Sequence, residues 1–246
     1  MSIKPSELSN FSIAKTMKRK SFVKSTDSCT STKTRTFKKV NQYQIKQLLG
    51  NGSIGAVNLC VSGDDKQIYA MKSIKRSNLK TWGSMGTVQM KVQEMEVLKD
   101  LVHKNIVKLH EIIDDPLKNK LYLVMDYLSG GTLAEKLKDS TDGLPEAEVR
   151  QYFRELIAAV HYCHEVKSLA HRDLKPENMM INKDGSLVLC DFGVSQFFTQ
   201  QKSKRDVVKG EMGTRRFMAP EFFNRSTGKV LQGKKIDIWA AGVTLF

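Results

Sequence analysis

Paired cysteines and long apolar runs are both missing from this chain of 246 residues. The four cysteines lie far apart and form no Cys-x-x-Cys pair, which argues against a zinc site or a disulfide framework. The N-terminus lacks the apolar segment of a secretory signal, and Ser2 stands where myristoylation needs glycine. No apolar run reaches the roughly 18 residues of a membrane-spanning helix. We therefore expect a cytoplasmic protein, with the nucleus as the alternative.

Acidic residues are scarce at the N-terminus, where the charge is uneven. Residues 1–40 hold ten Lys/Arg, two Asp/Glu and fourteen Ser/Thr, so they carry +8 of the formal net charge of +14. No hydrophobic period is sustained there. We expect residues 1–40 to be a disordered basic tail, either merely solvated, or phosphorylated, or bound to an anionic surface. A nucleic-acid module is disfavoured, because the chain lacks interleaved aromatic residues and a basic recognition helix.

Hydrophobic residues make up 40% of the chain, which is enough for one large or two small ordered domains. The pattern predicts strands near residues 43–49, 56–61, 67–74 and 121–128. Helical spacing follows at residues 88–98, and Pro145 opens a helix with apolar positions up to Cys163. Strands therefore dominate the first part and helices the later part, which indicates two lobes.

Two patterns in the first lobe suggest phosphate binding. Residues 50–57 read Gly-Asn-Gly-Ser-Ile-Gly-Ala-Val, and such glycines let backbone N–H groups approach phosphates closely. A dinucleotide-binding turn would need a helix directly afterwards, whereas a strand is expected here; a purely structural hairpin remains possible. Lys72, in an apolar strand, is costly to bury without an anion, and Glu94 on the following helix is a candidate partner.

The most specific segment is His171-Arg172-Asp173-Leu174-Lys175-Pro176-Glu177-Asn178. It places a carboxylate, an ammonium and an amide on one tight loop. A carboxylate is able to accept a hydroxyl proton, a lysine to neutralise a transferred phosphoryl group, and an asparagine carbonyl to bind Mg²⁺. Asp191-Phe192-Gly193 and then Ala219-Pro220-Glu221, preceded by Gly213-Thr214, follow in order.

These segments in this order resemble the eukaryotic protein kinases, from about Asn41 to Phe246. Lys175 and Gly213-Thr214 resemble serine/threonine rather than tyrosine kinases. Residues 112–116, 191–195 and 239–245 are similar to the calcium/calmodulin-dependent kinase kinases, and equally to fungal and plant kinases that activate AMP-activated-type kinases. The resemblance implies an α+β bilobal fold: an N-lobe of antiparallel sheet with one main helix at 41–128, and a mostly helical, incomplete C-lobe at 129–246.

The resemblance also implies a site for ATP and Mg²⁺ and a protein substrate, with another kinase as one candidate. Asp173 would be the catalytic base, Lys175 the phosphoryl-stabilising cation, Lys72 the phosphate ligand paired with Glu94, and Asp237 the anchor of the loop below. Asn178 and Asp191 would hold the metal. The residues implied around the nucleotide are Leu49, Gly50, Gly52, Gly55, Val57, Ala70, Lys72, Met125, Asp126, Leu128 and Met180.

The segment between Asp191 and Glu221 departs from the family pattern. The usual phosphorylated position, four residues before Thr214, is Gly210 here, with Glu211 beside it. Arg172 is the residue that would read a phosphate there. The hypothesis is that Glu211 partly substitutes, so that activity needs no loop phosphorylation. Nearby Lys202, Lys204, Arg205 and Lys209 could meet an acidic substrate or acidic neighbours.

The position of Phe246 also departs from the pattern, since related C-lobes continue for several helices. Those helices include an arginine that pairs with the residue equivalent to Glu221. We therefore expect exposed apolar surface, poor stability, and no calmodulin-binding segment in this chain. The leading prediction is a serine/threonine kinase, and the alternative is a catalytically silent scaffold. Cys190 is expected to be a small buried hydrophobe, or else an accessible thiol facing the nucleotide.

Overall fold

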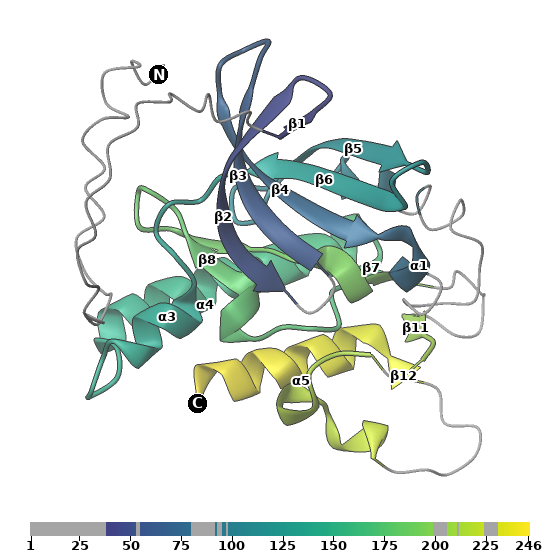
Figure 1. Cartoon of the computed structure of the whole chain (residues 1–246). Coiled ribbons are helices and arrows are strands. Elements are labelled where there is room, and N and C mark those ends of the chain that lie inside the picture. The colour runs from purple at the N-terminus through teal and green to yellow at the C-terminus, as the bar shows by residue number, and fades with distance from the viewer. Residues whose placement is uncertain are drawn as a thin grey trace, which may run out of the picture.

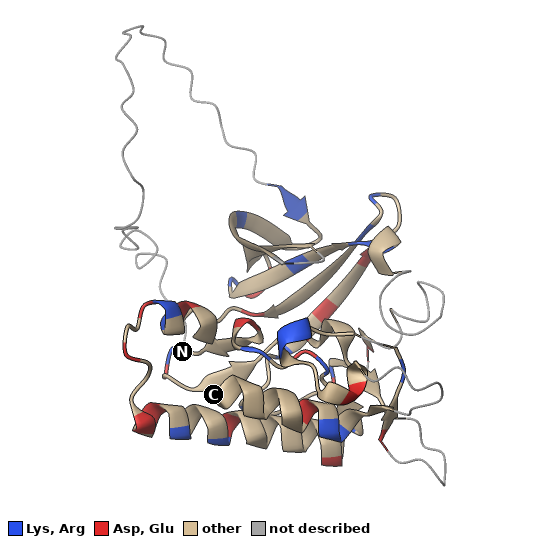
Figure 2. Ribbon diagram, turned by 90° about the horizontal axis from the view of Figure 1, so that it is seen from below, with Lys and Arg blue, Asp and Glu red and all other residues tan. Residues whose placement is uncertain are grey.

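The computed structural model describes residues 38–52, 55–79, 92, 95–96, 98–198, 206–210, 212–223 and 231–246. Within them the chain forms a sheet lobe followed by a mainly helical lobe, which confirms the expected bilobal α+β architecture (Figure 1). Acidic and basic positions are interspersed along the helices of the second lobe (Figure 2). No helix in the described part of the chain is long and apolar enough to span a membrane.

The sheet lobe is built on six antiparallel strands in the order β1-β2-β3-β4-β6-β5. The first strand begins at Lys39, close to the expected start near Asn41, and Val40 in it is buried. Residues 1–37, most of the predicted basic tail, lie outside the described residues. The strands are β1 (Lys39–Val40), β2 (Tyr43–Gly52), β3 (Gly55–Ser62), β4 (Ile68–Lys75), β5 (Leu109–Asp115) and β6 (Lys120–Asp126), and the short helix α1 (Arg76–Leu79) follows β4.

Both faces of the sheet are covered by apolar side chains. Met71 and Tyr122 belong to one cluster, whereas Ile74 packs in another with Val92 and Met95. Val92 and Met95 are buried positions of the segment predicted to be helical. Lys72, in the middle of β4, is therefore withdrawn from water, whereas Lys75 at the end of the strand is exposed.

The helical lobe packs around α3 (Leu133–Lys138), α4 (Glu146–His161) and α5 (Gly233–Leu245). Its core includes Leu156 and Val160, as the periodicity predicts, but also Tyr152, which the sequence pattern does not single out. Tyr152 hydroxyl bonds to Glu148 at 2.6 Å, so its polar end remains satisfied while its ring is buried. Thr132 begins α3 with a capping box in which its side chain and Glu135 exchange hydrogen bonds.

Short elements between the main helices carry the chemistry-bearing segments. A π-helix (Tyr162–Val166) follows α4 directly. The two-stranded pairs are β7 (Leu169–Ala170) with β10 (Gln196–Phe197), β8 (Met179–Ile181) with β9 (Leu187–Leu189), and β11 (Val207–Val208) with β12 (Leu231–Gln232). The 3₁₀ helices span Pro176–Asn178, Phe192–Val194, Arg215–Phe217 and Pro220–Phe222.

Candidate active site

The carboxylate of Asp173 collects three side-chain donors. Its Oδ2 atom lies 2.7 Å from Lys175 Nζ and 2.9 Å from Asn178 Nδ2, and its Oδ1 atom accepts from Thr214 Oγ1 at 2.7 Å. Lys175 Nζ also donates to Thr214 Oγ1 at 2.6 Å. The three residues predicted from one loop are therefore together, and Thr214 joins them from 41 positions away.

The pKa of Asp173 lies below its ordinary value. Burial by itself raises this pKa, but hydrogen bonds from Lys175 and Thr214, with the charge of Lys175 and a bond from Asn178, outweigh burial. The carboxylate is therefore ionised at neutral pH. A carboxylate has about four acceptor sites, and the three side-chain donors leave room for a further hydroxyl.

Asp237 of α5 holds the loop that carries Asp173. Its carboxylate accepts from the backbone N–H groups of His171 and Arg172, both at 2.8 Å, and from His164 Nε2 at 2.8 Å. Asp237 is only 1% exposed. These contacts are the geometry expected of Asp237 as the anchor of the catalytic loop. His164 is a further partner that the sequence analysis missed. A carboxylate with three donors stabilises the unusual backbone of Arg172, whose φ is +71°.

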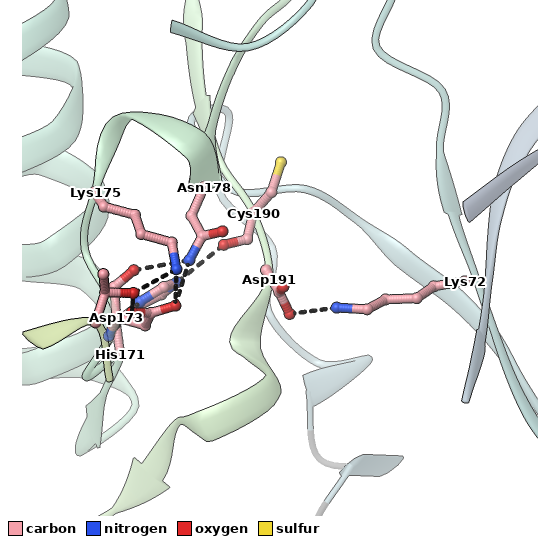
Figure 3. Close-up of polar contacts among 8 residues, drawn as sticks. Lys72, His171, Asp173, Lys175, Asn178, Cys190 and Asp191 are labelled. Atoms are coloured by element: carbon pink, nitrogen blue, oxygen red, sulfur yellow. Dashed lines mark hydrogen bonds and ion pairs between the residues drawn. The ribbon is translucent and has the colours of Figure 1, made fainter. Parts of the chain in front are cut away.

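Lys72 is buried and paired with Asp191. The Lys72 Nζ atom lies 2.7 Å from Asp191 Oδ1, although the two residues are 119 positions apart. Figure 3 shows Asp191 between Lys72 on one side and the group of Asp173, Lys175 and Asn178 on the other. Asp191 has a left-handed backbone, φ +58°, so its carboxylate is directed by strained geometry typical of functional sites. Glu94, the predicted partner of Lys72, lies outside the described residues.

The glycines of the predicted phosphate loop have different surroundings. An added Cβ at Gly50 would meet no atom within 4 Å, whereas at Gly55 it would lie 1.9 Å from the backbone oxygen of Ser73. Gly55 is therefore required for the close approach of β3 to β4, independently of any phosphate. Gly52 pairs with Gly55 across the β2–β3 turn, and Ser53 and Ile54 at its tip lie outside the described residues.

An apolar cluster stands where the adenine is expected. Leu128 packs with buried residues of β9, and Met125 and Met180 pack against the same cluster. Ala70 is directly opposite Met125 in the β4–β6 pair, so the predicted roof and gatekeeper residues adjoin. The remaining predicted residues lie on the neighbouring strands: Leu49, 40% exposed, is on β2, and half-buried Val57 is on β3.

Asp126 is bonded through its backbone to the residue before β5 and through its side chain to β5 itself. Its N–H donates to Lys108 O at 3.1 Å, and its Oδ1 atom lies 2.6 Å from His110 Nε2. His110 is at an irregularity in the β5–β6 register, between the Leu109 and Glu111 pairings. Bulges re-aim side chains near active sites, and this one directs His110 to the residue after Met125. The sequence pattern gave no signal for His110.

Neutral acceptors bond to both terminal nitrogens of Arg172, whereas its buried Nε atom has no hydrogen-bond partner among the described residues. Its guanidinium donates to Gln196 Oε1 at 2.8 Å and to the backbone oxygen of Gly210 at 2.5 Å. Burial lowers its pKa, and Asp237 partly offsets this. Gly210 stands at the position that the resemblance implies is usually phosphorylated, and its backbone carbonyl accepts the hydrogen bond from Arg172. Glu211 lies outside the described residues, so its predicted role stays a prediction; Gln196 is a partner that the sequence analysis missed.

Gly213 brings Thr214 back to the catalytic loop. Its φ is +120°, and an added Cβ would lie 2.4 Å from the backbone oxygen of Arg172. Only glycine fits both the conformation and the space. This close crossing explains how a residue of the activation segment reaches Asp173.

The described residues contain no group of three or more His, Cys, Asp or Glu side chains suited to a metal. A divalent ion at this site would depend on Asp191, Asn178 and oxygens supplied by a nucleotide. Mg²⁺ binds in this manner, through one or two protein oxygen ligands, waters and substrate phosphates. The donor set therefore fits Mg²⁺ and does not fit zinc, which prefers sulfur and nitrogen.

Cys190 precedes Asp191 and is 8% exposed. Its thiol packs in the apolar cluster of Leu128, and its Sγ atom lies 3.5 Å from Val188 O. Burial, followed by the charge of Asp191, raises its pKa. A buried neutral thiol is a poor nucleophile, which favours the structural role among the two alternatives considered for Cys190.

The outer face of α5 carries exposed apolar residues, as expected. Ile238 is 53% and Trp239 47% exposed. Glu221, in the 3₁₀ helix after Ala219, is half-buried, and no ion pair to it occurs within the part of the chain that the structure describes.

Comparison with known sequences decides the family. The profile described as "Protein kinase domain" matches residues 43–246. The chain belongs to the protein kinase family. It is 36% identical over 213 residues to a probable serine/threonine-protein kinase of Dictyostelium discoideum. That match covers 85% of the chain and 29% of the Dictyostelium protein. It is also 33% identical to a calcium/calmodulin-dependent protein kinase kinase of Caenorhabditis elegans, in a match that covers 84% of the chain and 41% of that protein.

A third kinase, CBL-interacting protein kinase 15 of rice, is 34% identical over 207 residues, covering 84% of the chain and 45% of that protein. The chain thus spans less than half of these relatives. The kinase resemblance drawn from the sequence is confirmed, including its likeness to a kinase kinase.

Proposed function

We propose that this chain is a serine/threonine protein kinase catalytic domain that transfers the γ-phosphoryl group of ATP to a protein hydroxyl. The observation that carries this is the group of Lys175, Asn178 and Thr214 around Asp173. The free acceptor site of Asp173 orients the attacking hydroxyl and takes its proton. A bond forms between that oxygen and the γ-phosphorus while the bond to the β–γ bridging oxygen breaks, and ADP leaves.

The chain's own charges suit the movement of negative charge in this reaction. Lys175, held beside Asp173, neutralises the transferred group, and Lys72 is available to the α- and β-phosphates when its pair with Asp191 is exchanged for them. Asn178 and Asp191 would hold Mg²⁺, which neutralises phosphate charge when bound. The backbones of Asp126 and Leu128 would form hydrogen bonds with the adenine. The apolar side chains that would enclose it are Leu49, Val57, Ala70, Met125, Leu128 and Met180.

The likeness to a kinase kinase supports a finer proposal, that the substrate is another kinase. The C. elegans relative carries that description in its name. An activation-segment peptide with a threonine acceptor is therefore the first protein substrate to test, beside a generic basic protein.

The test is transfer of labelled phosphate from γ-labelled ATP by the purified chain. Asp173→Asn and Lys72→Met should abolish transfer, while Asp184→Asn, an exposed aspartate bonded to Ser186, should not change it. Nucleotide binding without transfer by the unmodified chain would support the silent-scaffold alternative instead.

A further inference from the structure

The 3₁₀ helix that follows Thr214 begins directly beside the catalytic carboxylate. Thr214 is its N-cap, and its hydroxyl lies 2.7 Å from Asp173 Oδ1 and 2.6 Å from Lys175 Nζ. These contacts fix where the next two residues, Arg215 and Arg216, can be. A peptide that presents a hydroxyl to Asp173 therefore lies beside the start of this helix.

Arg215 and Arg216 are both exposed. The guanidinium of Arg215 stands 5.5 Å from the ring centre of Phe223, a contact that holds it near the surface without neutralising it. Among the residues that the structure describes, neither arginine forms an ion pair. Lys209, also exposed, adds a third positive charge to the same segment. The backbone N–H of Lys209 donates to Gln196 Oε1.

Two guanidinium groups without carboxylate partners favour an anionic ligand. Guanidinium binds carboxylate and phosphate oxygens in paired, planar hydrogen bonds, and it repels basic side chains. An extended peptide advances about 3.3 Å per residue, so a side chain within about four positions of the acceptor is able to reach Arg215 or Arg216. The charge of this short helix therefore bears on substrate choice.

We propose that Arg215 and Arg216 select acidic substrates, with Asp or Glu within about four residues of the phosphorylated Ser or Thr. This inference rests on the proposed kinase function and names the substrate class of that site. It assigns a specificity role to two residues that are outside the machinery of phosphate transfer.

The test compares peptides that differ only around one threonine. Aspartate, alanine, arginine or phosphoserine is placed at each position from four before to four after it, and kcat/KM is measured. The best aspartate peptide should exceed its arginine counterpart by about fivefold or more, the factor that one exposed ion pair supplies. A phosphoserine preference without an aspartate preference would overturn the proposal in favour of primed substrates.

The second part of the test reverses the charge of Arg216. Arg216→Glu should remove or invert the ratio between the aspartate and arginine peptides, whereas Lys183→Glu, an equal charge change on the exposed β8–β9 turn, should keep it. Equal rates for all peptides would overturn this proposal and leave the kinase function standing. If no peptide is phosphorylated, polarisation of labelled peptides measures binding alone, and equal binding of the aspartate and arginine peptides overturns the proposal.

Discussion

Lys72 Nζ lies 2.7 Å from Asp191 Oδ1, so a cation of the sheet lobe is joined directly to a predicted metal ligand of the helical lobe. Lys72 is 6% exposed, and its ammonium would be costly to bury alone. The pair thus keeps both charges satisfied before nucleotide arrives. It also implies that binding of a metal–nucleotide complex replaces one ionic contact by several.

Replacement of Lys72 or Asp191 should therefore have a small effect on stability and a large effect on activity. Lys72→Met removes a buried charge and leaves half-buried Asp191 able to meet water, so the chain should stay folded while transfer is lost by at least about a hundredfold. Thermal denaturation with and without Mg²⁺ and ATP measures both effects. The unmodified chain should gain several degrees with the nucleotide, and an equal gain by Asp191→Asn would contradict its role as metal ligand.

Thr214 should prove necessary for its hydroxyl rather than its shape. Thr214→Val keeps the side-chain volume but removes the hydrogen bond to Asp173. Because this bond lowers the pKa of Asp173, its loss should raise that pKa. The acid limb of the pH–rate profile should then move to higher pH, and kcat should fall by about tenfold, the factor of a lost charged hydrogen bond. Thr214→Ser restores the hydroxyl and should restore most of the rate. Identical profiles for the valine and serine variants would refute this assignment.

The same depressed pKa has a consequence for acid stability. Because the pKa of Asp173 is lower in the folded state than in the unfolded chain, its contribution to stability is complete well above the ordinary aspartate value. It is lost as the pH falls through the lowered folded-state pKa. Unfolding by urea at a series of pH values below about 5 should show a smaller loss of stability in Thr214→Val than in the unmodified chain.

Asp237→Asn should be the most destabilising conservative change in this region. The amide would turn a donor toward the N–H groups of His171 and Arg172 and leave one of them unsatisfied. Breaking a buried charged contact of this kind costs about 3–5 kcal/mol. Urea denaturation followed by circular dichroism measures the loss. Asp184→Asn, on an exposed turn, is the matched control and should stay within about 0.5 kcal/mol of the unmodified chain.

Arg172 should work without a phosphorylated activation segment. Because Gln196 and the Gly210 carbonyl already bond to it, phosphatase treatment should leave activity unchanged. Gln196→Ala would leave the buried guanidinium short of an acceptor at a cost of about 1–3 kcal/mol, with reduced activity. The hypothesis about Glu211 adds that Glu211→Ala and Glu211→Arg lower activity; unchanged rates in both would reject it.

His110 should act on nucleotide binding through Asp126. The 2.6 Å contact holds the side chain of Asp126, the residue after Met125, toward His110 of β5. His110→Ala should raise the KM for ATP by about twofold to fivefold with little change in kcat, since an exposed pair contributes up to about 1 kcal/mol. His110→Gln, which keeps a donor, should stay closer to the original. Tyr69, whose ring lies 5.0 Å from the histidine ring, limits where a substitute can go.

The sequence by itself determined the family and most of the chemical groups. Asp173, Lys175 and Asn178 are near neighbours along the chain, so their spacing already places them on one loop. Strands β2, β3, β4 and β6 and the helix from Glu146 follow from local periodicity, which depends on residues only a few positions apart, whereas the pattern did not predict β5. These short-range relations are visible without coordinates.

Only the tertiary structure decided which distant groups complete the site. Thr214 meets Asp173 across 41 positions, Asp237 meets His164 across 73, and Gln196 meets Arg172 across 24. No pattern along the chain specifies these contacts, because they depend on how separately formed segments pack. The tight crossing at Gly213 shows the physical reason: the loop returns to Asp173 only where the absence of a side chain lets two backbones touch.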